Sequence, residues 1–392
     1  MTAPLVRGWC PSLFEPMAAA DGLIARIKPF VSGLFADDLR LIADLADLYG
    51  SGAIELTSRA NLQVRGLTET NAPRFAKAIA AAGLASQDPA AERRRNVQAT
   101  GDCGPKLLAL ARELEAWLQR ASALDALPAK FGFAFSAGQP VDADIVVLGE
   151  DAPLIRIAGL SIAAKASDPL TALQTLTLSF VNLAARLSPP PRRMKALVER
   201  MGARTLLAQA GLSEAMTRTT ARYGREVFEG FDLGVVLGAL DSASLRTVAD
   251  LADHYGDGRV RLLPDRRLRL CKVTTEGRAA LSQAALQAGF AVHTADPRLR
   301  LRACVGRQGC VRTELDVRAH ALALAPLLPA STVLHVSGCI KGCAHPHPAD
   351  ATLAATGADR YDLIFNGAPS DPATYRDLTL DQAAHHLQAR YR

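Results

Sequence analysis

The sequence predicts an α+β fold in which one set of modules occurs twice. Residues 39–52 and 245–258 align without a gap, and ten of their fourteen positions are identical. Self-similarity of this kind indicates an internal duplication. The chain of 392 residues is too long for one ordinary domain, and the proline-rich segment 189–193 is a natural linker. Two related halves would pack about a pseudo-twofold axis and form a cleft between them.

A small module is predicted at the start of each copy. In the first copy, apolar side chains recur at helical spacing over residues 39–46, and Gly50 ends the helix. Stretches that alternate or run apolar like strands are 23–31, 53–57 and 61–65, with 234–240 before the second helix. A strand, a helix and a strand pair form half of a ferredoxin-like sandwich.

A larger α/β module is predicted after each small one. The apolar runs 131–135 and 332–336 both follow a Leu-Pro-Ala sequence, and residues 144–149 resemble residues 362–367. We therefore expect two ferredoxin-like half domains interleaved with two larger domains. The expected ranges are 1–70 and 71–190 for the first copy, 191–222 for a linker, and 223–292 and 293–392 for the second copy.

The composition narrows the classes of function. The net charge of +6 favours an anionic partner, but the basic residues are not interleaved with aromatics, which argues against nucleic acid. No apolar stretch approaches 18 residues and the N-terminus has no apolar run, so we expect neither a membrane span nor a signal peptide. Cys10, Cys103 and Cys271 show no disulfide framework, which favours the cytoplasm.

Four late cysteines are the most informative chemical feature. Cys304 and Cys310 have five residues between them, and Cys339 and Cys343 have three. Two such thiolate clusters, flanked by glycines, suit a 4Fe–4S cluster. A structural zinc site usually has two residues between its paired cysteines, so zinc is a weaker alternative. Unrelated core cysteines are the other alternative.

This combination resembles the sulfite/nitrite reductase superfamily over essentially the whole chain. The resemblance implies the duplicated fold described above and a 4Fe–4S cluster on the four late cysteines. In the reductases the last cysteine, which corresponds to Cys343, also bridges to a sirohaem iron.

The resemblance also implies a set of catalytic cations. The superfamily has an arginine in a Thr-x-Arg motif, an arginine before Asn-Val and a lysine after Leu-Pro-x, which match Arg59, Arg95 and Lys130. The reductases have a second lysine two positions later, where this chain has Gly132. We expect the glycine to remove charge and open space, which argues against sulfite or nitrite chemistry.

Within the superfamily, the chain is most similar to the branch that converts precorrin-3A to precorrin-3B in aerobic cobalamin biosynthesis. The similar motifs are 7–12 and 337–346, and the second has Ile340-Lys341 where the reductases generally have Pro-Asn. This resemblance implies a monooxygenase that hydroxylates C20 with dioxygen and closes a lactone from the ring-A acetate. A sirohaem-dependent sulfite or nitrite reductase is the alternative, and a nucleic-acid-binding protein with a structural metal is a third.

Precorrin-3A and sirohaem are both tetrapyrroles with many carboxylates, and binding these carboxylates requires fixed cations. The residues expected to bind them are Arg59, Arg65, Arg95 and Lys130 in the first half, and Arg302, Arg307 and Lys341 beside the cysteines in the second. Dioxygen chemistry calls for a further iron, and His345 and His347 are candidate ligands of a mononuclear non-haem iron. They could instead lie in a proline-directed turn and contact carboxylates. The sequence shows no clear glycine-rich loop that would bind a nucleotide. We therefore expect an external electron donor, either an NADH-linked reductase or a ferredoxin.

Overall fold

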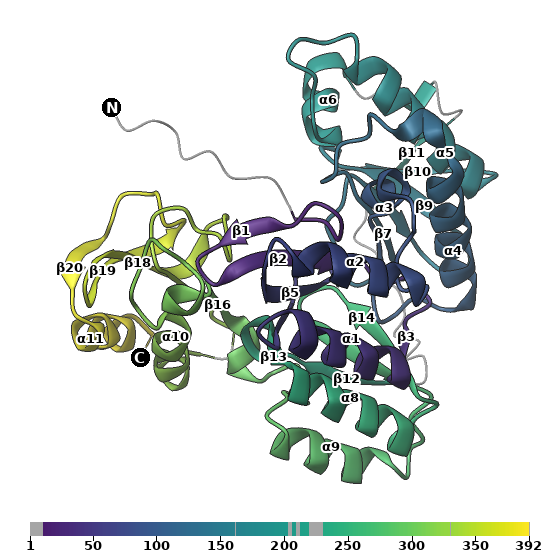
Figure 1. The fold of residues 1–392 in the computed structure, drawn as a ribbon. Coiled ribbons are helices and arrows are strands. Elements are labelled where there is room, and N and C mark those ends of the chain that lie inside the picture. Colours follow the sequence, from purple (N-terminus) through teal and green to yellow (C-terminus); the bar gives the residue numbers. More distant parts are fainter. Residues whose placement is uncertain are drawn as a thin grey trace.

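The computed structural model describes residues 11–160, 162–202, 206–208, 212–218, 230–329 and 331–391. Most of the motif at residues 7–12, with Cys10, lies outside the described residues. These described residues form four β-sheets with helices packed against them (Figure 1). Two sheets belong to the central half domains, and each larger domain contains one of the others.

The two half domains have matching elements. The first contains β1 (Met17–Ala19), β2 (Gly22–Ile27), α1 (Ala36–Tyr49), β4 (Ala53–Leu56), β5 (Leu62–Leu67) and α2 (Asn71–Ala81). The second contains β12 (Gly230–Gly234), α8 (Ser242–Tyr255), β14 (Arg259–Leu263), β15 (Arg267–Cys271) and α9 (Arg278–Gln287). Phe75 and Ile79 of α2 are buried in the same core as α1, so packing extends the first unit beyond residue 70. The other expected ranges stay predictions.

Each half domain receives a strand from the other. Strand β3 (Leu34–Phe35) pairs with β14, and β13 (Ala239–Asp241) pairs with β4. The partners Leu34↔Val260 and Ile54↔Leu240 occupy matching positions of the duplicated sequence. The expected strand 234–240 is therefore wrong as one element. Strand β12 ends at Gly234, and a 3-10 turn at Val236–Gly238 leads into β13.

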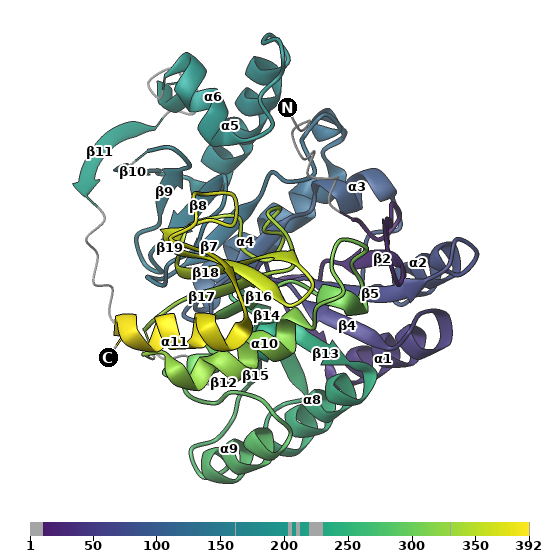
Figure 2. The same ribbon diagram turned by 90° about the vertical axis from the view of Figure 1, so that its left-hand side faces the viewer.

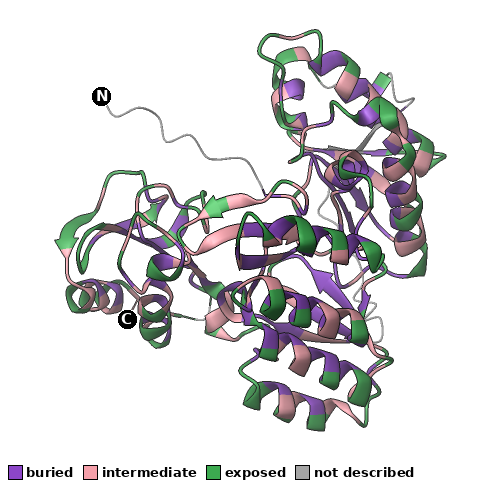
Figure 3. Cartoon of the chain, in the orientation of Figure 1, coloured by how far each residue is buried: buried purple, intermediate pink, exposed green. Residues whose placement is uncertain are grey.

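Helices α1 and α8 show the pseudo-twofold relation most directly. They pack side by side below the central sheets (Figure 1). Arg40 pairs with Asp250 and Asp253, and the matching Arg246 pairs with the matching Asp44 and Asp47. Side chains from both half domains form one hydrophobic core. Their helices present exposed faces outward and buried faces toward the sheets (Figure 3).

The first larger domain has a six-stranded sheet. Its strands are β6 (Val97–Ala99), β7 (Phe133–Ser136), β8 (Ile145–Leu148), β9 (Leu154–Ile157), β10 (Ile162–Lys165) and β11 (Ser213–Arg218), in that spatial order. Its helices are α3 (Pro89–Arg94), α4 (Pro105–Arg120), α5 (Pro169–Ala184) and α6 (Met194–Met201). Pro105 and Pro169 stand at the first turns of their helices, where a missing amide hydrogen is tolerated.

The second larger domain has a five-stranded sheet. Its strands are β16 (Leu301–Ala303), β17 (Leu334–Ser337), β18 (Ala349–Gly357), β19 (Arg360–Gly367) and β20 (Tyr375–Leu378). Its helices are α10 (Val317–Leu324) and α11 (Leu380–Tyr391). A view turned by 90° shows this domain in front of the central strands (Figure 2).

Strand directions establish which elements of the larger domains correspond. Strands β6, β7 and β8 are parallel neighbours, and β9 follows antiparallel. Strands β16, β17 and β18 repeat this pattern before antiparallel β19. Strand β8 therefore corresponds to β18, and the expected correspondence between residues 144–149 and 362–367 is wrong. Among the described residues, no helix is long and apolar enough to cross a membrane.

Candidate functional site

The four late cysteines lie in two loops at one edge of a sheet. Cys304 directly follows β16, and Cys339 comes shortly after the neighbouring parallel strand β17. Cys310 and Cys343 belong to the same two loops. The amide of Gly338 donates to Cys304 Sγ at 3.2 Å, which ties one loop to the other. Since parallel strands end at a common edge, the topology brings both cysteine pairs together.

The thiols of Cys304 and Cys343 have pKa values that are shifted by burial and by the other cysteines. Burial raises the pKa of the Cys304 thiol, and Cys310 and Cys339 act in the same direction. Burial also raises the pKa of Cys343, with contributions from the other three cysteines. None of the four forms a disulfide. No group of ligands suited to a single metal ion is found within the described ranges. The two pairs, with five and three residues between their cysteines, are spaced more widely than the usual pairs of a zinc site, and this spacing suits a cluster better than zinc.

Glycines shape the two cysteine loops. Gly306 and Gly342 have φ angles of +65° and +60°, in the left-handed region that other residues rarely adopt. A Cβ atom on Gly338 would collide with Thr313, next to the Cys310 turn. The glycines expected near the cysteines therefore permit two tight turns and a close approach between the loops.

Arg65 supports the first cysteine loop from the half domain. Its guanidinium binds Asp21 at 2.8 Å and Glu55 at 3.3 Å, and its Nη2 donates to the carbonyl of Gly309 at 3.4 Å. Glu55 also binds Arg318 of α10. The side chain of Arg65 is only 6% exposed. The expected contact between Arg65 and a ligand carboxylate is thus replaced by internal carboxylates, and Arg65 positions the loop before Cys310.

Arg95 lies in a second internal network. It is 1% exposed, binds Glu92 at 2.8 Å and Glu115 at 3.5 Å, and stacks over the ring of Phe30. Two buried carboxyls thus share one guanidinium, and burial raises the pKa of Glu115 to about 7. This burial argues against direct contact between Arg95 and a ligand.

The environment of Gly132 differs from the expectation of open space. A Cβ atom there would lie 2.8 Å from Nδ2 of Asn96. Asn96 is held in this place because its amide donates to the carbonyl of Phe131 at 2.9 Å. The glycine therefore permits close packing and does not open a cavity. Lys130 is half-buried in the turn before β7.

Arg59 lies where the two halves meet. Its loop, residues 57–61, forms a bridge between Arg59 and Pro264 of the matching second loop, and Asp265 N donates to Ser58 O at 3.1 Å. The side chain of Arg59 is half-buried. The sequence thus located a residue on the pseudo-twofold contact.

The remaining expected residues lie around the cysteine loops. Arg307 is exposed and binds Asp316 at 3.3 Å, and half-buried Lys341 lies close enough to lower the pKa of Cys343. His345 and His347 have ring centroids 5.9 Å apart. His345 also lies 5.7 Å from the ring of His335, measured between centroids.

The sequence reasoning missed His335 and its neighbour Arg266. Both lie close to Arg302 and His345, with which they interact electrostatically. One signal was available, because His335 interrupts the apolar run of β17 between Leu334 and Val336. Arg266 gave no such signal, because its place beside β16 and β17 depends on the packing between domains.

The matching loops of the first half are closed by their own side chains. Asp102 accepts hydrogen bonds from the amides of Ala137 and Gln139, which ties the loop after β6 to the loop after β7. Arg269 binds Asp232 and donates to the carbonyl of Gly101. Burial raises the pKa of the Cys103 thiol to about 11. This edge of the molecule thus has a buried, protonated thiol and internal hydrogen bonds.

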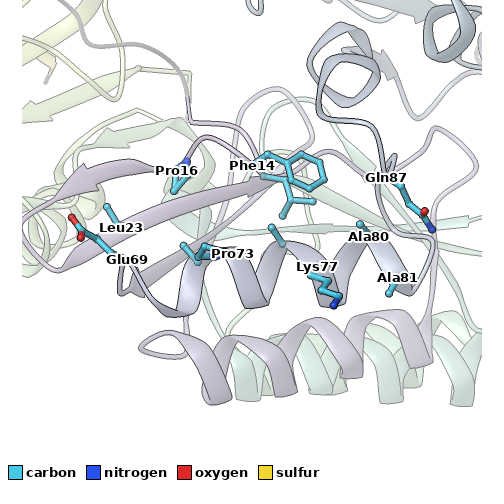
Figure 4. A pocket seen from close by; sticks show the side chains of 12 residues that line it. Phe14, Pro16, Leu23, Glu69, Pro73, Lys77, Ala80, Ala81 and Gln87 are labelled. Carbon is cyan, nitrogen blue, oxygen red and sulfur yellow. The ribbon is translucent and has the colours of Figure 1, made fainter.

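An apolar groove over α2 is a separate feature. Phe14, Pro16 and Leu23 line it from one side, with Pro73 and Lys77 of α2 on the other (Figure 4). Glu69 and Lys77 are the charged residues among its twelve described lining residues. The groove contains none of the residues expected to bind a polycarboxylate.

Comparison with known proteins agrees with this geometry. The family described as nitrite/sulfite reductase ferredoxin-like half domain matches residues 15–82 and 229–288, one stretch in each copy. The Mycobacterium tuberculosis NirA protein has a similar fold, with a TM-score of 0.71, 16% identity and coverage of 93% of this chain and 79% of that chain. The duplicated α+β fold and the resemblance to the sulfite/nitrite reductase superfamily are therefore confirmed.

Two relatives that align with most of the chain refine this class. The chain is 29% identical over 402 residues to a precorrin-3B synthase from a Sinorhizobium species, across 96% of this chain and 86% of the relative. It is 25% identical over 403 residues to a ferredoxin–nitrite reductase of Synechococcus elongatus, across 88% and 78% of the respective chains. The expected similarity to precorrin-3B synthase is thus confirmed, and an enzyme of the oxidoreductase type is supported.

Proposed function

We propose that this chain is a precorrin-3B synthase that hydroxylates precorrin-3A at C20 with dioxygen. The similarity to a precorrin-3B synthase over 96% of the chain is the observation that carries the proposal. One oxygen atom enters the product and the other leaves as water, so two electrons and two protons must be supplied. The ring-A acetate then closes a lactone onto C1 as a C1–C20 double bond becomes single, and the carboxyl proton passes to the new oxygen on C20. An NADH-linked reductase or a ferredoxin would supply the electrons.

The chain's own thiols fit the cofactor that this chemistry requires. Cys304, Cys310, Cys339 and Cys343 would hold a 4Fe–4S cluster, since they interact with one another and none is in a disulfide. When bound, the cluster supplies electrons one at a time. Arg65 would hold the Cys310 loop in place through the carbonyl of Gly309.

The substrate would be held by cations around the cysteine loops. Arg59 at the contact between the halves, and Arg307 and Lys341 beside the cysteines, would bind its carboxylates. Lys130 would add a cation from the first larger domain. His345 and His347 would contribute ligands to a mononuclear iron that handles dioxygen.

A sirohaem-dependent reductase is the second candidate, favoured by the similarity to a ferredoxin–nitrite reductase over 88% of this chain. The structure gives an argument against it. The reductases have a lysine at the position of Gly132, and Asn96 Nδ2 occupies the space that such a side chain would enter. One cation of the anion-reducing set is therefore absent.

The test is anaerobic purification followed by quantification of iron, sulfide and tetrapyrrole, and then incubation with precorrin-3A, a reductant and isotopically labelled dioxygen. We expect iron and sulfide without bound sirohaem, and a product that has gained one labelled oxygen atom by mass spectrometry. A purified protein that contains sirohaem and reduces sulfite or nitrite would overturn the proposal.

A further inference from the structure

We propose that Arg266, Arg302 and His335 form a carboxylate-binding subsite beside the cysteine loops. The ligand class is a polycarboxylate tetrapyrrole, so this inference rests on the proposed function. Arg266 and His335 were not among the residues expected from the sequence. The subsite assigns a part of the second half to the ligand, in addition to the cations of the first half.

The fold brings these residues to one surface of the second larger domain. Arg302 of β16 and His335 of β17 are direct partners in the parallel register. Leu334 and Val336, on either side of His335, are buried in the core under α10 and α11. Because side chains alternate along a strand, His335 points to the opposite face of the sheet. Arg266 approaches this face from the turn between β14 and β15.

His335 is buried without a polar partner. Its side chain is 0% exposed, and neither Nδ1 nor Nε2 makes a hydrogen bond within the described part of the chain. An unsatisfied buried polar group destabilises the folded state, and such groups are rare in native proteins. A ligand oxygen that binds the ring would remove this destabilisation.

Half-buried Arg266 differs in its partners from three of the buried arginines. Arg65, Arg95 and Arg269 each bind carboxylates of the protein. The side chain of Arg266 forms no hydrogen bond or ion pair with the residues that the structure describes. Burial, together with the nearby charge of Arg302, lowers the pKa of Arg266 to about 10. Two partly buried like charges side by side favour a bound anion.

The subsite lies against the cysteine loops. His335 also faces His345, which follows Cys343 by two residues, and Cys339 begins the loop after β17. A carboxylate held by Arg266, Arg302 and His335 would therefore orient the macrocycle next to the four thiols. The same chemistry would serve a tetrapyrrole substrate or a sirohaem cofactor.

The duplication provides a well-matched substitution. Arg266 has a φ angle of 60°, and Ala60, at the matching position of the first copy, has a φ angle of 58°. Alanine is thus already accommodated in this backbone conformation. Arg266→Ala should therefore fold, and it removes the guanidinium together with the Cγ and Cδ methylenes that carry it. Arg246→Ala on α8 is the control, because it removes the same charge from an exposed helix surface.

The experiment is a fluorescence titration of the full chain with uroporphyrin III, a stable octacarboxylate tetrapyrrole. We expect Arg266→Ala to bind at least tenfold more weakly than the wild type, Arg266→Lys to recover part of the loss, and Arg246→Ala to stay within twofold. His335→Phe should weaken binding while raising the melting temperature of the free protein, because it removes an unsatisfied buried group.

The outcomes separate the subsite from the proposed function. If Arg266→Ala binds uroporphyrin III as tightly as the wild type does, the subsite is wrong and the ligand class stands. If the wild type does not bind uroporphyrin III, both the subsite and the polycarboxylate ligand class are overturned. Sirohaem that co-purifies with the wild type and is lost from Arg266→Ala would support the subsite as part of a cofactor site. Reversible binding by tetrapyrrole-free protein would support it as part of a substrate site.

Discussion

The loops after β6 and β7 and the loops after β16 and β17 stand at the same place in the two halves, yet they have opposite character. In the first half, Asp102 ties the two loops together and Arg269 closes the gap to the half domain. In the second half, the loops present four thiols, and the side chains of Arg266 and His335 form no hydrogen bond with the described residues. The duplicated scaffold thus has one edge that is closed by internal hydrogen bonds and one edge that carries four thiols.

A few residues that differ between the two copies account for the different character of the two edges. Arg261 and Arg269, which reach the carbonyls of Thr100 and Gly101, occupy the positions of Glu55 and Gln63 in the first copy. Glu55 instead pairs with Arg65 and with Arg318. The side chains that face each edge therefore decide whether it is sealed, while the backbone pairing stays the same.

The largest effect should come from the cysteines. Cys343→Ser should abolish the electron paramagnetic resonance signal of the reduced cluster and lower the iron and sulfide content, because one thiolate ligand is lost. Cys103→Ser changes the buried cysteine of the first half and should leave the iron content unchanged. A normal signal from Cys343→Ser would remove Cys343 from the ligand set.

Arg269→Ala tests the contacts that close the loops of the first half against its neighbouring half domain. This variant removes the closer of the two arginines that pair with Asp232, leaving Arg267 at 3.8 Å, and it removes the donor to the carbonyl of Gly101. We expect a loss of about 3 kcal/mol in the free energy of unfolding, measured with urea, because a largely buried charge pair is broken. Uroporphyrin III binding should be unchanged at a temperature where the variant is folded, and a matching loss of binding would show that the first edge also holds ligand.

Arg59→Ala tests the contact between the halves. We expect uroporphyrin III binding about tenfold weaker, which corresponds to the loss of one charge-assisted contact of about 1.4 kcal/mol. The free energy of unfolding should change less than the free energy of binding. If the variant is strongly destabilised and binds normally when folded, Arg59 has a structural role.

Glu115→Gln tests whether Arg95 is internal to the first half. The pKa of Glu115 is about 7 in the folded protein, above its ordinary value of 4.5, so the folded state holds the proton more tightly. Relative to the variant, the wild type should therefore lose about 1–2 kcal/mol of stability as the pH rises from about 5 to about 8. Urea unfolding across this range measures the difference, and a parallel pH dependence of both proteins would contradict it.

Local signals allowed much of the fold to be predicted. Helix α1 and strands β4 and β5 lie where apolar periodicity and Gly50 indicated. The exchange of β3 and β13 gave no local signal, since two- and three-residue strands are defined by partners far along the chain. For the same reason, residues 362–367 were matched to β8 by composition, whereas strand direction identifies β18.

The site was predictable where residue type alone suggests chemistry. The spacing of the four cysteines identified two loops that the topology brings to one edge. The cations were harder, because their roles depend on partners distant in sequence. Arg95 meets Glu115, and Arg65 meets Asp21, only in the folded chain. Arg266 was missed for the opposite reason, since what distinguishes it is the lack of a described side-chain partner.

The exchanged strands also bear on the origin of the chain. Ala36 N donates to Gly258 O and Ser242 N donates to Gly52 O, the same contact made twice in opposite directions. A symmetric homodimer whose two subunits exchanged a strand would leave this pair of contacts after its genes were duplicated and fused. Neither lobe should then be soluble when expressed alone, whereas the two co-expressed fragments should reassemble.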